Sequence, residues 1–161
     1  MRDEDPGYRL IKGRRWRISD PSLDETLRQA LVDELMAARR AVGTARRAAD
    51  ADAERDARVR VGDAKVALGE RGPRWWTALD DDDRRVRAVA AARALLRARD
   101  AAAVLGPGEI ARVIDGAGWR RRLGLAREVL EALCREGELT ERTASPFRAG
   151  RGPRFPSPPA R

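Results

Sequence analysis

Residues 109–137 read EIARVIDGAGWRRRLGLAREVLEALCREG, and this stretch decides the fold that the sequence predicts. Its first six residues, 109–114, have a short helical pattern that ends at Gly116. An apolar stripe at helical spacing follows and stops before Gly137; its members are Trp119, Leu123, Ala126, Leu130 and Leu133. We therefore predict a short helix, a tight connection and a longer amphipathic helix.

Another helix precedes this pair and a strand pattern follows it. Val86, Val89, Ala90 and Leu96 form the expected stripe of a helix over residues 84–99. Residues 138–143 alternate like a strand, and residues 154–155 return after a loop rich in Gly, Pro and Arg. This order, three helices and then a β-hairpin, is typical of a winged helix, a helix-turn-helix followed by a β-ribbon. We expect a winged-helix domain over residues 79–156 and a disordered tail over residues 157–161.

A basic hairpin is expected near the start of the chain. Residues 8–18 alternate apolar and basic side chains around Gly13, which favours two strands joined by a tight turn. A two-residue turn would place Trp16 opposite Arg9. A three-residue loop would instead align Tyr8, Leu10, Trp16 and Ile18 on one face. We prefer the second register, because it separates a buried apolar face from an arginine face.

Two helical stripes follow the hairpin and predict an antiparallel helical pair. The first stripe comprises Leu27, Leu31, Leu35, Ala38 and Val42, and the second comprises Ala57, Val61, Ala64 and Leu68. Small residues on the second stripe let the two helices approach closely. Ser22 is the expected N-cap of the first helix, with Glu25 three residues further on. The glycines and proline of residues 69–73 are expected to end the second helix.

Together these elements describe a mainly α (α+β) protein in two modules. Residues 1–78 are expected to form a β-hairpin and αα-hairpin module, followed by the winged-helix domain. Trp75 and Trp76 come directly after the second helix. We expect them to pack where the two halves meet, because buried aromatic rings dominate small cores.

The net charge of +8 is confined to two short segments. Residues 6–17 contain five basic side chains and no acid, residues 142–161 contain five more and no acid, residues 1–5 contribute −2, and residues 18–141 balance to zero. A GC-rich genome explains a generally high arginine content but not this confinement. The distribution points to a polyanion bound by β-ribbons rather than by a uniformly basic body.

The expected partner is nucleic acid in the form of duplex DNA, and the expected role is non-enzymatic. The candidate contacts are Lys12, Arg14, Arg15 and Arg17 in the first hairpin, Arg120, Arg121 and Arg127 in the amphipathic helix, and Arg142, Arg148, Arg151 and Arg154 in the wing. Arginine suits both phosphate and guanine. Glu128 and Glu131 share the helix surface and reduce its positive charge. The alternative is an adaptor that docks a protein partner through the helical hairpin and winged helix, because fold alone does not fix function.

No catalytic or metal centre is expected. The sequence has no histidine and one cysteine, Cys134, so the commonest general base and metal ligand are absent and no disulfide forms within the chain. The run Asp80 to Asp83 is the remaining metal candidate. Adjacent carboxylates converge poorly on one ion, so we prefer an N-cap at a helix start. We predict no cofactor and no enzymatic activity.

The expected location is the cytoplasm. Residues 1–6 carry no apolar run of the kind that a signal peptide needs. No stretch approaches the roughly 20 apolar residues that span a bilayer. We therefore expect no membrane partner.

Several segments resemble a bacterial family of small uncharacterised proteins, some of which carry a Tol biopolymer-transporter label. They are GRRWRISDPS at residues 13–22, LVDELMAARRAV at residues 31–42, and DAKVALGERGP at residues 63–73 with the two tryptophans after it. EIAR at residues 109–112, with Trp119 leading into the long helix, is similar to a separate domain family of unknown function with winged-helix character. The resemblance implies a bacterial protein and supplies no catalytic residues.

Overall fold

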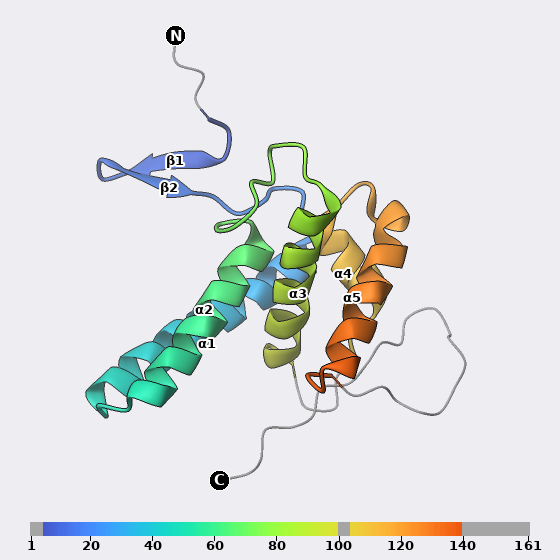
Figure 1. The fold of residues 1–161 in the computed structure, drawn as a ribbon. Coiled ribbons are helices and arrows are strands. Elements are labelled where there is room, and N and C mark those ends of the chain that lie inside the picture. The colour runs from blue at the N-terminus through green and yellow to red at the C-terminus, as the bar shows by residue number, and fades with distance from the viewer. Residues whose placement is uncertain (1–4, 100–103, 140–161) are drawn as a thin grey trace.

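The protein is mainly helical, with a small antiparallel sheet at its N-terminal side (Figure 1). The structure is a computed structural model that describes residues 5–99 and 104–139. Its elements are β1 (Tyr8–Ile11), β2 (Arg14–Arg17), α1 (Glu25–Arg47), α2 (Ala51–Leu68), α3 (Asp81–Arg97), α4 (Pro107–Ile114), the 3-10 turn η1 (Trp119–Arg122) and α5 (Leu123–Arg135). The predicted hairpin, helical pair and three-helix order are therefore present.

α1 and α2 form the predicted antiparallel pair and lie side by side along their length (Figure 1). From α1 the buried residues include Leu27, Leu31, Leu35 and Ala38, and from α2 they include Ala57, Ala64 and Leu68. Leucine on one helix thus meets mostly alanine on the other. The short alanine side chains let the helices approach closely, as the stripes indicate.

The N-cap of α1 differs from the prediction. Asp24 caps this helix, and its Oδ1 accepts hydrogen bonds from the backbone N–H groups of Thr26 and Leu27 at 3.1 and 3.2 Å. Ser22 donates instead to Asp20 Oδ1, from its backbone N–H at 2.9 Å and from its hydroxyl at 2.7 Å. The reason is that Asp20 is buried, and a buried carboxylate must be supplied with donors.

The hairpin adopts the two-residue register, so the preferred three-residue register is wrong. Arg9 pairs with Trp16, and Ile11 pairs with Arg14 across the turn. Lys12 and Gly13 both have positive φ, at 48° and 74°, as a two-residue turn requires when its twist must match that of the strands. The expected buried apolar face is also absent, because Leu10 is 69% exposed and Trp16 is 47% exposed. The ribbon projects from the helices (Figure 1).

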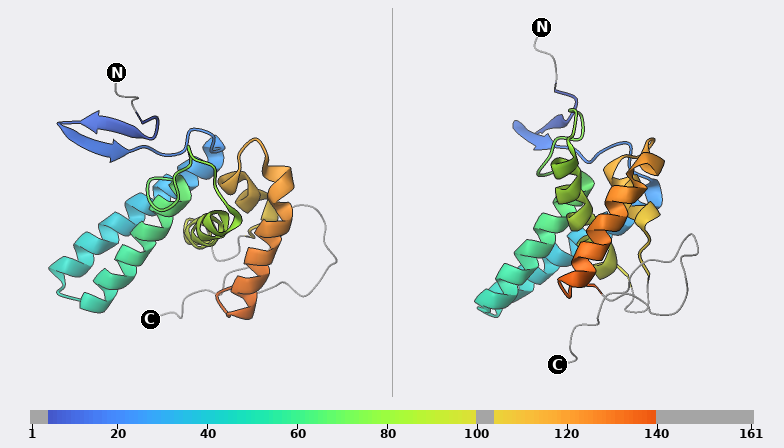
Figure 2. Two further views of the ribbon diagram at one scale, coloured as in Figure 1. Left: turned by 45° about the horizontal axis from the view of Figure 1, so that its top comes forward. Right: turned by 45° about the vertical axis from the view of Figure 1, so that its right-hand side comes forward.

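α3 is the central helix, and this explains why its predicted stripe was partly wrong. Figure 2 shows α3 between the α1–α2 pair on one side and α4 with α5 on the other. Val86, expected inside, is 53% exposed. Ala90 and Leu96 of the predicted stripe are buried, and so are Ala88, Ala91, Ala92, Ala94 and Leu95, which lie outside it. A helix packed on several sides buries more than one stripe, so a single period does not identify its core face.

One hydrophobic core extends across residue 79, the predicted boundary between modules. Its members include Leu31 of α1, Leu68 of α2, Leu95 of α3, Ile110 of α4 and Leu130 of α5. All five helices of the described chain therefore contribute to the same buried cluster. The division into independent units at residues 1–78 and 79–156 stays a prediction.

A buried ion pair crosses the same boundary. The guanidinium of Arg87 on α3 donates from Nη1 to Asp20 Oδ2 at 2.7 Å and from Nε to the Ala67 carbonyl at 3.1 Å. The backbone N–H of Asp20 donates to the Leu68 carbonyl at 2.8 Å. Burial lowers the pKa of Arg87, and the charge of Asp20 opposes that shift. These contacts join the segment before α1, the end of α2 and the middle of α3.

Replacing Asp20 with Asn should strongly destabilise the fold. Asp20→Asn leaves the Arg87 charge buried without a counter-ion, so the free energy of unfolding should fall by about 3 to 5 kcal/mol in urea titrations. Asp33→Asn is the matched control, because Asp33 is exposed on α1 and should change stability by less than about 0.5 kcal/mol. Equal effects of the two substitutions would contradict the assigned role of the buried pair.

A second ion pair gives the fold a defined pH dependence. Arg93 of α3 donates to both carboxylate oxygens of Glu138, which follows α5, at 2.7 and 2.5 Å. The hydrogen bond from Arg93 lowers the pKa of Glu138 below its ordinary value of 4.5. A carboxylate with a lowered pKa in the folded state stabilises the fold above its unfolded pKa, and this contribution is lost as the pH falls through the folded pKa.

Glu138→Gln should therefore be less stable than the parent at neutral pH, by under about 1 kcal/mol because the pair is partly exposed. The difference should shrink as the pH falls below 4.5. Urea unfolding of both proteins across this range measures it. A stability difference that does not change with pH would show that the carboxylate charge is not responsible.

Candidate nucleic-acid interface

The two faces of the β-ribbon differ in what they contact. Directly paired residues of an antiparallel ribbon project to the same side. Arg9 with Trp16 and Ile11 with Arg14 therefore share one face, and Tyr8 with Arg17 and Leu10 with Arg15 share the other. We call the first set, Arg9, Ile11, Arg14 and Trp16, the outer ribbon face. All four of its residues are exposed, and so is Lys12 in the turn.

The opposite face holds the ribbon to the segment that follows α2. The Tyr8 ring meets Trp76 edge-on with centroids 5.6 Å apart, and the Arg17 guanidinium lies 4.8 Å above the Trp76 ring. Trp76 also occupies the space that a Cβ on Gly7 would need, so only glycine fits there. Trp75 donates from Nε1 to the Ile18 carbonyl at 3.2 Å. The two tryptophans thus anchor the ribbon, and their expected packing where the two halves meet stays a prediction.

Arg17 is an anchor residue in this structure. It donates from Nη1 and Nη2 to the carbonyls of Gly72 and Pro73, both at 2.8 Å. Burial lowers its pKa, and its Nε is buried without a hydrogen-bond partner among the described residues. Arg17 was expected to contact phosphate, but its guanidinium already binds backbone carbonyls within the protein. Arg15 is only partly engaged by the protein. Its guanidinium stacks 4.5 Å from the Tyr8 ring centroid, and its Nη2 lies 3.8 Å from Asp5 Oδ2.

A second group of cations lies at the start of the last helix. The predicted long helix begins as the 3-10 turn η1, which carries Arg120 and Arg121 at exposed positions. Trp119 accepts two stacked guanidinium groups, with Arg112 at 4.5 Å and Arg120 at 4.7 Å from its ring centroid. Arg127 is exposed on α5. Arg120, Arg121 and Arg127 are therefore displayed on the surface, as the helical pattern predicts.

Nearby acidic side chains reduce the positive charge of this second group of cations. Asp115 lies 3.1 Å from Arg122 and 4.0 Å from Arg121, measured between nitrogen and carboxylate oxygen. Glu128 of α5 contacts Arg85 of α3 at 3.5 Å. The start of α5 is thus less positive than the outer ribbon face, as its sequence indicates.

The aspartates at residues 80–83 start α3, in agreement with the prediction. Asp80 Oδ1 accepts from the backbone N–H of Asp83 at 2.8 Å. Arg84 and Arg85 pair with Asp81 and Asp82 at 3.1 and 3.2 Å. Across residues 5–99 and 104–139, no group of three or more Cys, Asp or Glu side chains is placed to hold a metal ion.

None of the helices in the described parts of the chain is both long enough and apolar enough to cross a membrane.

The candidate residues are only partly brought together. Figure 1 shows the ribbon, the segment between α2 and α3, and the turn leading into η1 at one end of the helices. Arg142, Arg148, Arg151 and Arg154 lie outside the described residues, so their place in the interface stays a prediction. Arg9 and Trp16 join the candidate set here. Sequence reasoning missed them because their position depends on the hairpin register.

Comparison with known proteins places a family domain on the second part of the chain. Residues 83–142 match the family described as "Protein of unknown function (DUF3253)". The chain therefore contains a domain of an uncharacterised family that begins within α3 and extends beyond α5. The comparisons show neither the winged-helix assignment nor the Tol label. Neither the curated proteins nor the solved structures give a match.

The different roles of Arg17 and Arg14 predict different effects on stability. Arg17→Gln removes two hydrogen bonds and a cation–π contact, so it should lower the free energy of unfolding by about 1 to 2 kcal/mol. Arg14→Gln removes the same charge from an exposed position and should change it by less than about 0.5 kcal/mol. Thermal unfolding followed by tryptophan fluorescence measures both. A larger effect of Arg14→Gln would contradict the assignment of inner and outer faces.

Proposed function

We propose that this protein binds nucleic acid, with duplex DNA as the ligand of the outer ribbon face. The observation that supports this most is a projecting two-stranded ribbon whose exposed side carries Arg9 and Arg14, with Lys12 at its tip. The major groove of B-DNA admits a two-stranded β-ribbon. The ribbon thus matches a duplex in both shape and charge.

The outer ribbon face combines cations with apolar side chains. Among the described residues, Asp5 is the acid that pairs with a ribbon cation, and its partner is Arg15 on the opposite face. The Arg9 and Arg14 charges are therefore left for phosphates, which position a protein on the duplex. Trp16 and Ile11 offer apolar contact to sugars and to thymine methyl groups.

We further propose that α3, α4 and the η1–α5 segment are the three helices of a winged helix. Their order, lengths and mutual packing support this assignment. On this proposal Arg120, Arg121 and Arg127 contact phosphates from the start and the exposed side of α5. The wing then comprises the segment that carries Arg142, Arg148, Arg151 and Arg154. The ribbon and η1 lie at the same end of the helices, which favours one shared duplex (Figure 1).

A protein-binding adaptor is the second candidate function, and the ribbon supports it too. Leu10, Ile11 and Trp16 are exposed large apolar side chains on it. A two-stranded ribbon also has unpaired edges that another protein's strand can extend. Such an interaction would depend on apolar and backbone contacts rather than on the ribbon cations.

A salt series with random-sequence duplex DNA separates the two functions. Each neutralised phosphate steepens the fall of log affinity with log salt by about 0.9. Replacing Arg9, Lys12 and Arg14 with Gln should flatten this slope by up to about three contacts. Replacing Arg142, Arg148, Arg151 and Arg154 with Ala should flatten it by up to about four contacts if the wing also binds.

The control removes the same charge elsewhere, with Arg40, Arg47 and Arg55 of the α1–α2 pair replaced by Gln. It should leave the slope nearly unchanged, because these residues are exposed on α1 and α2 and not on the ribbon. If the intact protein shows no salt-dependent binding, or if control and ribbon variants flatten the slope equally, the nucleic-acid proposal fails. The adaptor then takes its place.

A further inference from the structure

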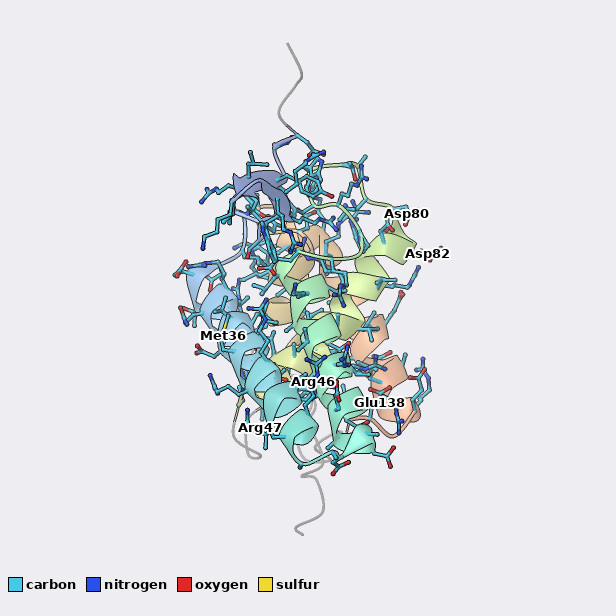
Figure 3. The ribbon with its side chains drawn as sticks, turned by 90° about the vertical axis from the view of Figure 1, so that its left-hand side faces the viewer. Met36, Arg46, Arg47, Asp80, Asp82 and Glu138 are labelled. Carbon is cyan, nitrogen blue, oxygen red and sulfur yellow. The ribbon has the colours of Figure 1, made fainter. Side chains whose placement is uncertain are left out.

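An arginine-lined groove runs between α1 and α2. The residues that line it are Arg39, Val42 and Arg46 of α1, Arg58 and Val61 of α2, and Arg71 just after α2. Its volume is about 290 Å³. Figure 3 looks onto these two helices, with Arg46 labelled where they lie side by side. The groove is thus formed by the helical pair and does not include the ribbon.

Positive charge in this groove is poorly compensated. Four guanidinium groups line it and no lining residue is acidic. Glu54 supplies the neighbouring carboxylate, and its Oε1 accepts from Arg46 Nε at 2.8 Å and from Arg58 Nε and Nη2 at 3.0 and 2.6 Å. The hydrogen bonds from these two arginines lower the pKa of Glu54, so it is charged at neutral pH. Within the described residues, the side chains of Arg39 and Arg71 form no hydrogen bond or ion pair.

Several other arginines on α1 and α2 each have their own acidic partner. Arg28 pairs with Glu25, Arg55 pairs with Asp52, and Arg60 pairs with Glu34, each with a carboxylate of its own. On α1 and α2, arginines outside the groove can therefore each form an ion pair with a separate carboxylate. In the groove, by contrast, two arginines share one carboxylate oxygen and two have none. The excess positive charge leaves the site open to an anion from solution.

The spacing of the arginines favours an extended anion. Arg39 and Arg46 are seven residues apart on α1, which is about 10 Å along the helix axis. A single tetrahedral phosphate is too small to contact both, whereas a chain of linked phosphates reaches along the row. The volume is at the lower end for small-molecule pockets, and the two valines offer little apolar surface. The site therefore suits a small, highly charged chain.

We propose that the α1–α2 groove binds an oligophosphate: inorganic pyrophosphate or triphosphate, or the phosphate chain of a nucleotide. Guanidinium groups bind phosphate oxygens through paired, charge-assisted hydrogen bonds. Arg39 and Arg71 contribute donors with no other partner. Arg46 and Arg58 turn toward the ligand from Glu54. This site is separate from the outer ribbon face and does not depend on DNA binding.

Isothermal calorimetry on the full chain tests the proposal, with inorganic triphosphate, pyrophosphate, orthophosphate and ATP as the probes. Triphosphate should bind more tightly than pyrophosphate, and orthophosphate should bind weakest, because only longer chains reach both ends of the arginine row. ATP as tight as triphosphate shows that the phosphate chain alone is recognised. ATP tighter than triphosphate shows that a nucleotide is the natural source of the chain.

Matched double variants locate the site. Arg39→Gln with Arg71→Gln should raise the Kd for triphosphate about tenfold or more, because charge-assisted hydrogen bonds are lost. Arg40→Gln with Arg47→Gln removes the same charge from exposed positions of α1 outside the groove lining and should leave the Kd within about twofold. Arg39 and Arg71 make no side-chain hydrogen bond or ion pair in the described structure, so the first variant should keep the parent's thermal unfolding temperature.

Glu54→Gln provides a test in the opposite direction. It removes the carboxylate that competes for Arg46 and Arg58, so triphosphate should bind severalfold more tightly. Absence of triphosphate binding by the parent, or equal weakening in both double variants, would overturn the proposal. So would a loss of DNA salt dependence in the Arg39/Arg71 variant as large as in the ribbon variant, since the groove would then be part of a DNA interface.

Discussion

The Asp20–Arg87 ion pair is the contact on which the arrangement of the helices depends. It links the chain before α1 to the middle of α3, and Arg87 also donates to the last turn of α2. Removing one partner of such a pair leaves an unpaired charge in a nonpolar interior. This lowers the free energy of unfolding far more than the loss of a surface pair does. The pair therefore sets how the helical hairpin meets the three-helix part, and the leucines and alanines of the shared core pack around that geometry.

The same region decides where the ribbon lies. Asp20 follows β2 by three residues, and Trp75 bonds to the Ile18 carbonyl close by. Gly69 ends α2 with a positive φ and lies against both Trp75 and Arg87. The ribbon base is thus attached to the end of α2 next to the buried pair. One face of the ribbon is used for this attachment, and the outer ribbon face is left to solvent with its cations.

Arginine has three distinct uses in this chain. Arg87 and Arg17 hold segments together by donating to backbone carbonyls. Arginines such as Arg28 and Arg55 pair with single carboxylates on helix surfaces. A third set, in the ribbon and in the α1–α2 groove, has few acidic partners, and both proposed binding sites rest on it. Composition alone does not separate the three uses, because they differ only in what surrounds each guanidinium.

Local patterns in the sequence determined the helical pair, the α3 cap at Asp80 and the end of α2 at Gly69. These features depend on neighbours within a few residues, through 3.6-residue periodicity, capping and backbone freedom. Tertiary structure decided the hairpin register, the buried faces of α3 and the anchoring role of Arg17. Each of these depends on segments far apart in sequence: Arg17 meets Gly72, and α3 is enclosed by four other helices. Periodicity records which residues are apolar, but only packing determines how many sides of a helix are covered.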